Sequence, residues 1–145
     1  VEVEFQYFPS NQFQLVGSYS YMDTEVISDN QRPARVGTEV PDTPRNSYRL
    51  WAKYTLDKGP FKRAWIGVGY LFTDKMRGNR NPANFRIWTD SWSRIDASLG
   101  YDMKIGKTNV NWVLTMENLE DKDYIDYMLI RGRPFNARLS ATFTF

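Results

Sequence analysis

The sequence predicts an all-β fold, an antiparallel transmembrane β-barrel of the outer-membrane type, and three observations support this prediction. Seven segments of roughly 8–12 residues alternate between apolar and polar side chains, at the period of a β-strand and the length of a tilted membrane strand. The polar side of these segments carries full charges in mid-strand, which a water-filled or plugged lumen accepts. Aromatic residues recur near the segment ends, as in the aromatic girdles of membrane barrels.

The first three predicted strands span residues 1–8, 13–22 and 47–56. The third shows the alternation well, with one exception at Trp51. Its apolar side holds Tyr48, Leu50, Ala52, Tyr54 and Leu56, and its polar side holds Ser47, Arg49, Lys53 and Thr55. One face of each strand is therefore expected to meet lipid and the other the lumen.

The remaining four predicted strands span residues 64–73, 92–103, 109–117 and 134–145. The last alternates without a break, with Phe135, Ala137, Leu139, Ala141, Phe143 and Phe145 on one side. The sixth has its exception at Val113. No stretch of the chain shows the apolar period of a helix.

The connections between these strands alternate between short and long. Residues 9–12, 57–63 and 104–108 are short and turn-like, whereas residues 23–46, 74–91 and 118–133 are long and polar. Antiparallel neighbours joined in this way place all short turns at one end of the sheet and all long loops at the other. In outer-membrane barrels the short turns are periplasmic and the long loops extracellular.

Composition excludes several classes of protein. The 19 basic and 17 acidic residues leave a net charge of +2, which argues against nucleic-acid binding driven by bulk charge. The chain has no Cys and no His, so disulfide frameworks, zinc sites with these ligands and His-dependent nucleophiles are absent. We predict no catalytic residues and no metal site, and we expect the protein not to be an enzyme.

The number of predicted strands is odd, whereas single-chain bacterial barrels have an even number because both termini return to the periplasm. The last strand ends at the short-turn end, so the first strand begins at the long-loop end. We therefore expect the C-terminal part of a larger barrel, which supplies the remaining strands. The length of 145 residues would otherwise suit one ordinary domain.

Two other interpretations remain open at this point. The chain could be a small structural or adhesive outer-membrane barrel with one strand missed, or a soluble all-β binding domain whose apolar faces meet in a core. The residues upstream of Val1 distinguish a small barrel from a larger one. Further strands before Val1 would indicate a larger barrel, whereas a signal peptide directly before Val1 would indicate a small one. Detergent dependence and heat-modifiable gel mobility separate both barrels from the soluble domain.

Four motifs, taken in their order along the chain, resemble the TonB-dependent outer-membrane receptors, especially their siderophore-receptor branch. Residues 41–51 (PDTPRNSYRLW) are similar to a P-x-x-P-[KR]-[HN] loop exit that runs into a strand, and residues 94–97 (RIDA) to an R-x-D-[AV] strand motif. Residues 118–124 (NLEDKDY) resemble N-L-x-D-K-x-Y at the start of the last extracellular loop. Residues 132–134 (GRP) resemble the G-R-P-R entry to a last strand with a terminal aromatic.

One departure from these motifs is Phe135, which stands where the family has a basic residue. The resemblance implies a 22-stranded barrel with a plugged lumen, of which this chain forms about seven C-terminal strands. It also implies a bacterial outer-membrane location and uptake of a ferric siderophore or similar scarce nutrient. Import would be driven by the TonB complex through a plug domain that is absent from this chain. No cofactor is expected, since an iron chelate would be the substrate.

Candidate ligand contacts lie on the long loops, since loops on a rigid scaffold carry recognition. Arginine forks and aromatic faces suit an anionic or catecholate iron chelate. The candidates are Arg77, Arg80, Arg86 and Trp88 in the loop over 74–91, and Tyr124, Tyr127 and Arg131 in the last loop. Packing against lipopolysaccharide or other loops is the alternative role for these side chains.

Other residues are predicted to contact the lumen and the assembly machinery. The residues expected to face the lumen or the plug are Arg49, Lys53, Arg94, Asp96, Asp102, Glu117 and Arg138. Folding back the 104–108 turn brings Arg94 near Glu117, so we expect a structural ion pair there. Phe143 and Phe145 resemble the terminal signal that the barrel-assembly machinery reads. Carboxylates in the last loop lack the spacing of a calcium-binding EF-hand, so they are expected to be solvated.

Overall fold

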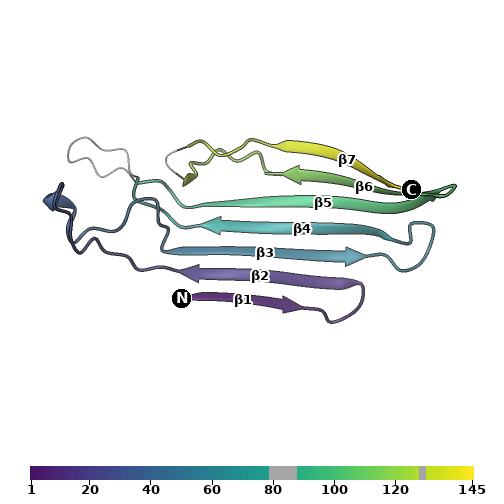
Figure 1. Ribbon diagram of the computed structural model, residues 1–145, viewed down its shortest axis with the longest axis horizontal. Helices are drawn as coiled ribbons and strands as arrows, with labels where there is room; N and C mark the ends of the chain where they lie inside the picture. The colour runs from purple at the N-terminus through teal and green to yellow at the C-terminus, as the bar shows by residue number, and fades with distance from the viewer. Residues whose placement is uncertain (79–87, 128–129) are drawn as a thin grey trace.

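Seven antiparallel strands form one sheet whose strand order follows the chain order (Figure 1). The computed structural model describes residues 1–78, 88–127 and 130–145. The strands are β1 (Glu2–Tyr7), β2 (Phe13–Tyr21), β3 (Asn46–Thr55), β4 (Ala64–Thr73), β5 (Trp92–Ile105), β6 (Thr108–Glu117) and β7 (Asn136–Thr144). A short 3-10 helix, η1 (Pro33–Arg35), lies in the loop between β2 and β3.

The strand bounds confirm the seven predicted strands, each to within two residues at either end. The largest differences are at β5, which continues to Ile105, and at β7, which begins at Asn136 rather than at residue 134. The late start of β7 has a local cause. The backbone N–H of Phe135 donates to Oδ1 of Asp121 at 2.8 Å, so it is used by the loop and not by the strand ladder.

The predicted polar side of every strand lies on one face of the sheet. One row of register partners crosses six strands and runs Gln14, Lys53, Gly67, Ser98, Thr115 and Arg138. Successive side chains of a strand point to opposite faces. Arg49, Arg94, Asp96, Asp102 and Glu117 share the parity of this row and therefore its face.

The opposite face is apolar and exposed. A register row on it runs Phe5, Gly17, Leu50, Tyr70 and Ile95. Leu50, Ile66 and Leu99 are 40–48% exposed, although each lies within a strand that has neighbours on both sides. A sheet with an apolar face turned outward and a charged face turned inward has the polarity of an outer-membrane barrel.

Two tryptophans stand on the polar face, against the prevailing pattern. A Cβ atom added to Gly67 would lie 2.2 Å from the ring of Trp51, and one added to Gly100 would lie 2.1 Å from the ring of Trp65. Each indole therefore lies against the bare backbone of the neighbouring strand, where glycine leaves the space. This packing explains why Trp51 breaks the alternation of β3.

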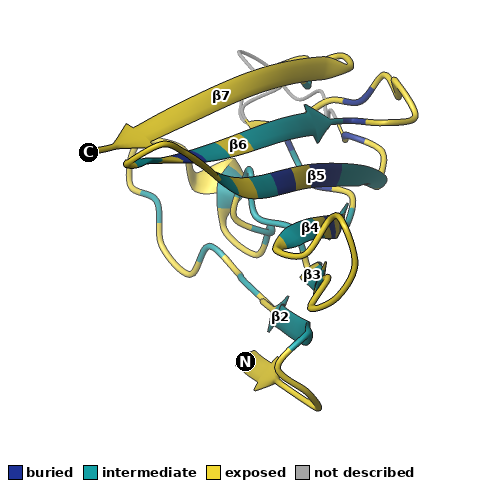
Figure 2. Ribbon diagram, turned by 90° about the vertical axis from the view of Figure 1, so that its right-hand side faces the viewer, coloured by how far each residue is buried: buried dark blue, intermediate teal, exposed yellow. Residues whose placement is uncertain are grey.

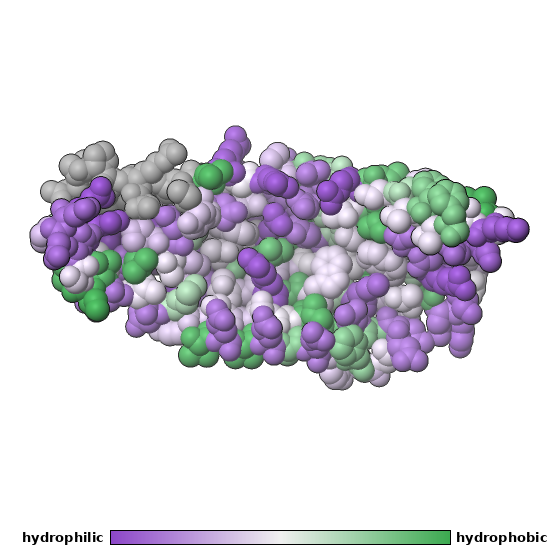
Figure 3. Space-filling model, viewed as in Figure 1, coloured by the Kyte–Doolittle hydropathy of each residue, from purple (hydrophilic) through white to green (hydrophobic). Residues whose placement is uncertain are grey.

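The long loops and the short turns lie at opposite ends of the sheet, as predicted (Figure 1). The start of β1 is at the long-loop end, and the end of β7 is at the short-turn end. Hydrophilic side chains gather at both of these ends in Figure 3. In the part of the chain that the structure describes, no helix combines the length and apolar character needed to cross a membrane.

The sheet is open, with β1 and β7 at its edges. Figure 2 shows that its strands follow an arc and that these two outer strands are exposed along their whole length. An arc of seven strands with one lipid-facing side is consistent with a partial barrel.

Candidate functional site

The candidate ligand site lies at the long-loop end, where the first two long loops are joined through Arg77. Nη1 of Arg77 donates to Oγ1 of Thr38 and, at 3.1 Å, to the carbonyl oxygen of Glu39. The backbone N–H of Asp42 donates to the carbonyl oxygen of Arg77 at 2.7 Å. The guanidinium of Arg77 thus holds the two loops together, so a ligand would have to share it with these acceptors.

Trp88 lies on the returning limb of the second long loop, opposite Arg77 in an antiparallel bridge. Next to this bridge along the chain, Met76 and Thr89 are buried and exchange hydrogen bonds, with Met76 N–H to Oγ1 of Thr89 at 3.1 Å. Trp88 itself is 44% exposed, and the ammonium of Lys75 stands 5.8 Å from its ring centroid. This pair presents an aromatic face and a positive charge to the outside. The predicted contacts Arg80 and Arg86 lie outside the described residues.

Asn118 is the hydrogen-bonding centre of the last long loop, which joins β6 to β7. It is fully buried. Its Nδ2 donates to the carbonyl oxygens of Lys122 (2.9 Å) and Arg133 (3.0 Å), and its Oδ1 accepts from the N–H of Lys122 (3.0 Å). A buried amide with these partners satisfied stabilises the loop, since leaving any one unpaired carries a desolvation penalty.

Tyr124 belongs to the same base of the loop. Its ring stands 4.3 Å from that of Trp92 between centroids, and its hydroxyl accepts from Nη1 of Arg94 at 3.1 Å. A Cβ atom added to Gly132 would lie 2.2 Å from its ring carbons. With 7% exposure, Tyr124 offers little surface to a ligand.

Tyr127 and Arg131 lie nearer the tip of this loop and are open to solvent. Tyr127 is 57% exposed, and the Arg131 side chain is 76% exposed. Arg131 donates to both carboxylate oxygens of Asp123, at 2.8 and 3.0 Å. This hydrogen-bonded carboxylate raises the pKa of Arg131 above its already high ordinary value, so the guanidinium stays charged at any physiological pH.

The structure corrects the prediction that Arg94 pairs with Glu117. Nη2 of Arg94 instead lies 2.8 Å from Oδ2 of Asp96, two residues along the same strand and on the same face. Glu117 lies 3.8 Å from the guanidinium of Arg133 in the last loop. In the β5–β6 ladder Ala97 pairs with Met116, so Glu117 follows opposite Asp96 and not opposite Arg94. Asp96 is therefore the carboxylate on this face that the guanidinium of Arg94 reaches.

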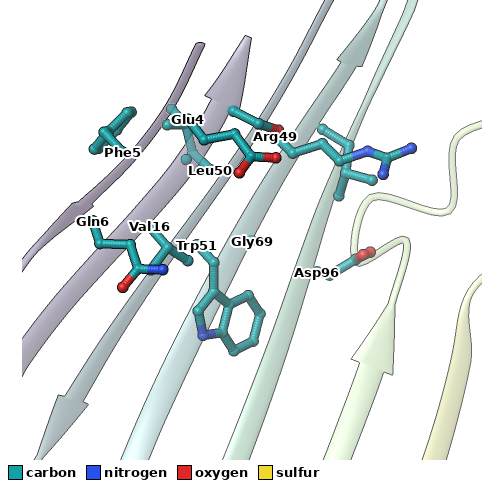
Figure 4. Close-up of a pocket in the computed structure, with 12 residues that line it drawn as sticks. Glu4, Phe5, Gln6, Val16, Arg49, Leu50, Trp51, Gly69 and Asp96 are labelled. Carbon is teal, nitrogen blue, oxygen red and sulfur yellow. The ribbon is translucent and has the colours of Figure 1, made fainter. Parts of the chain in front are cut away.

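Other charged residues of the polar face also have neighbours. Asp102 accepts from Nδ2 of Asn111 at 2.6 Å, and the Lys53 ammonium stands 4.6 Å from the centroid of Trp65. Arg49 borders a groove of about 370 Å³ between β1 and β5 (Figure 4). Figure 4 shows Glu4, Arg49, Trp51 and Asp96 around this groove.

Three acidic residues of the last loop make local contacts. Glu120 lies 2.8 Å from the ammonium of Lys122, Asp121 accepts the N–H of Phe135, and Asp123 pairs with Arg131. Over residues 1–78, 88–127 and 130–145, no cluster of three or more metal-binding side chains occurs.

Sequence reasoning missed the roles of Asn118, Asp121 and the two lumen-side tryptophans. From the sequence, Asn118 is only a letter of a motif and Asp121 is expected to be one of the solvated carboxylates of the last loop. Both instead adopt a left-handed backbone conformation, with φ of 54° and 47°. Asn and Asp tolerate this conformation better than other non-glycine residues. An Asn directly after a strand and an Asp three residues later were the available signal.

Comparison with known proteins supports one family. The TonB dependent receptor-like β-barrel family matches residues 1–119. The ferrichrome outer membrane transporter/phage receptor of Escherichia coli K12 is 32% identical over 127 residues, which are 86% of this chain and 16% of that protein. The metal-pseudopaline receptor CntO of Pseudomonas aeruginosa is 24% identical over 139 residues, 94% of this chain and 19% of that protein.

Two solved structures show the same fold. The siderophore receptor PiuA of Acinetobacter baumannii superposes with a TM-score of 0.74 at 24% identity, over 97% of this chain and 20% of that one. The open form of the ferric-catecholate import receptor Fiu of E. coli K12 gives a TM-score of 0.67 at 22% identity, over 97% of this chain and 19% of that one.

The chain thus spans about a fifth or less of the length of these relatives. The family consists of transport receptors of the bacterial outer membrane, which is where this sheet lies. The matches cover the barrel part of the relatives, in agreement with the two-faced antiparallel sheet. The chain belongs to the TonB-dependent receptor β-barrel family.

Proposed function

We propose that this chain forms part of the barrel and of the extracellular loops of a receptor that takes up a ferric siderophore or a similar scarce nutrient. The observation that carries the proposal is the seven-stranded sheet with a charged face, an exposed apolar face and all long loops at one end. The names of the relatives, which include a ferrichrome transporter and a metal-pseudopaline receptor, support iron or metal chelates as the substrate class.

In this proposal the chain is the C-terminal segment of the barrel, and the whole receptor supplies the remaining strands and a plug. Arg49, Lys53 and Arg138 then face the lumen and the plug, together with Arg94, Asp96, Asp102 and Glu117. TonB acts on the plug, which lies outside residues 1–145. The iron enters as part of the substrate, so the receptor needs no resident cofactor.

Ligand contacts of the proposed receptor fall on the exposed loop residues. Trp88, Tyr127 and Arg131 present two aromatic faces and a permanently charged guanidinium at the long-loop end. These groups suit an anionic or aromatic chelate. Arg80 and Arg86 remain candidates on charge alone. Arg77 and Tyr124 contribute less, because they are less exposed than Arg131 and their polar groups also bond within the protein.

The end of β7 is the proposed signal for the barrel-assembly machinery. Phe143 and Phe145 stand on the apolar face at the short-turn end, with exposures of 53% and 100%. Terminal aromatics in this position are accessible to a partner before the barrel closes. Outer-membrane lipid and lipopolysaccharide then cover the same face in the finished barrel.

Growth rescue tests the proposed function. The full-length receptor is expressed in a bacterial strain that lacks its own siderophore receptors, on iron-limited medium with a panel of ferric hydroxamates, catecholates and mixed chelates. Rescue by a subset of the chelates, lost when the strain also lacks TonB, is the expected result. Equal growth with and without the receptor on every chelate would contradict uptake of iron chelates.

A further inference from the structure

The base of the last long loop is closed by side chains at the point where the strand ladder stops. The β6–β7 ladder ends at the pair Glu117 and Asn136. Beyond it, Nδ2 of Asn118 reaches the carbonyl oxygen of Arg133 on the returning limb, and Oδ1 of Asp121 accepts the N–H of Phe135. The two limbs of the loop are thus joined by side-chain bonds.

The same base is tied to β5, a strand with neighbours on both sides. Oδ1 of Asp96 accepts the backbone N–H of Asn118 at 2.8 Å, and the N–H of Leu119 donates to the carbonyl oxygen of Ile95 at 2.8 Å. The Tyr124 hydroxyl accepts from Arg94, which is itself paired with Asp96. The loop base therefore rests on the polar face of the sheet.

Backbone conformation adds a second, independent sign that this base is fixed. Asn118 and Asp121 both have positive φ, which costs free energy for any residue with a Cβ atom. Such conformations persist where the surroundings over-determine them. Here the side-chain bonds of both residues are the surroundings that hold the backbone.

We propose that Asp96, Asn118, Asp121 and Tyr124 form a latch of positioning residues that holds the last long loop in a fixed orientation over the mouth of the barrel. Tyr127 and Arg131, beyond the latch and nearer the tip, are exposed. In the receptor proposed above, on which this inference rests, the latch orders the tip before a ligand arrives. Tyr124 serves the latch and does not contact the ligand.

Spin-label mobility in the full-length receptor tests the latch. This chain has no Cys, so Ile130→Cys, with any cysteine elsewhere in the receptor replaced by serine, gives a single labelling site near the tip. In the parent protein the label is expected to be immobilised. In Asn118→Gly the glycine can still adopt the left-handed backbone conformation, but the hydrogen bonds of the Asn118 side chain are lost. The immobilised component of the spectrum should therefore be lost.

Matched variants separate the latch from general destabilisation. Asp121→Asn keeps an oxygen acceptor for Phe135 and should retain the immobilised label, whereas Asp121→Gly should lose it. Gly132→Ala keeps every polar group but displaces the Tyr124 ring, and should also free the label. Asn109→Ala, an exposed asparagine at the far end of β6, is the control that leaves mobility unchanged. Heat-modifiable gel mobility confirms that each variant folds.

A label that stays immobilised in folded Asn118→Gly and Gly132→Ala would overturn the latch, whatever the receptor transports. Binding of ferric ferrichrome is measured on the same proteins. A latch that orders the tip predicts about tenfold weaker binding in Asn118→Gly, because binding must then order the tip side chains. If the parent receptor binds no chelate of the growth panel, the proposed function fails while the mobility result still decides the latch.

Discussion

The indole rings of Trp51 and Trp65 pack against glycines on the polar face of the sheet. In Gly67→Ala the new Cβ would stand 2.2–2.9 Å from three ring carbons of Trp51, so the indole must swing away from the sheet. We expect a loss of about 1–3 kcal/mol in the free energy of unfolding, the usual cost of overpacking. Urea unfolding of the full-length receptor, followed by heat-modifiable gel mobility, measures it.

The control is the same substitution in a variant without the Trp51 ring, where the loss of stability should disappear. In a Trp51→Ala background the ring is gone, and Gly67→Ala should be neutral or stabilising by about 0.5–1 kcal/mol, since glycine within a strand is less favourable than alanine. If Gly67→Ala costs the same in both backgrounds, the contact between Trp51 and Gly67 is not the cause.

Arg94 and Asp96 form an ion pair whose side chains are only 17% and 15% exposed. Removing one partner leaves the other charge poorly solvated, so Arg94→Leu should cost about 3 kcal/mol in unfolding free energy. Asp96→Leu should cost more, because the N–H of Asn118 then also loses its acceptor. A double-mutant cycle in the full-length receptor measures the coupling, and additive costs from the two single variants would contradict it.

Successive residues of one strand face lipid and lumen in turn, and two neighbouring residues of β7 allow the two environments to be compared directly. Leu139 and Ser140 are adjacent, both exposed and near mid-strand, but they lie on the apolar and the polar face respectively. Leu139→Arg places a charge in lipid and should destabilise the barrel by about 2–4 kcal/mol. Ser140→Arg faces the lumen and should be tolerated. Equal unfolding free energies for the two variants in lipid or detergent would contradict the assignment of faces.

The strands could be predicted from the sequence because alternation at period two is a property of each strand alone. It predicted the seven strands and the common face of the seven charged residues that were assigned to the lumen side. It could not identify the partner of Arg94, since that depends on which of two carboxylates on one face is nearer. Nor could it explain Trp51, whose packing depends on glycines in the next strand, 16 and 18 residues further along the chain.

The long loops were less predictable for the same physical reason. Their structure depends on side chains that bridge segments far apart in sequence, as Arg77 bridges to Thr38 and Asn118 to Arg133. The motif at 118–124 predicted the family, but the role of its Asn and Asp became visible only once their bonds and backbone angles were known. Ligand contacts on these loops remain predictions.

The whole molecule has two unpaired edges and an apolar face, and both require partners. β1 and β7 are exposed along their length, and their free N–H and C=O groups cannot be left unpaired in lipid. Residues 1–145 by themselves should therefore not yield a heat-modifiable monomer in detergent, but should form larger species through the strand edges. The full-length receptor, whose remaining strands pair both edges, should give the heat-modifiable monomer.

Size-exclusion chromatography and unheated gel mobility of both proteins, refolded side by side in the same detergent, check this prediction. The lipid-facing assignment also makes the isolated segment dependent on detergent, because its exposed Leu, Ile, Val and Phe side chains have no core to enter. A folded, monomeric 145-residue protein in plain buffer would contradict both the open edges and the lipid-facing side. It would instead favour a soluble sheet protein whose apolar face is covered by its own chain.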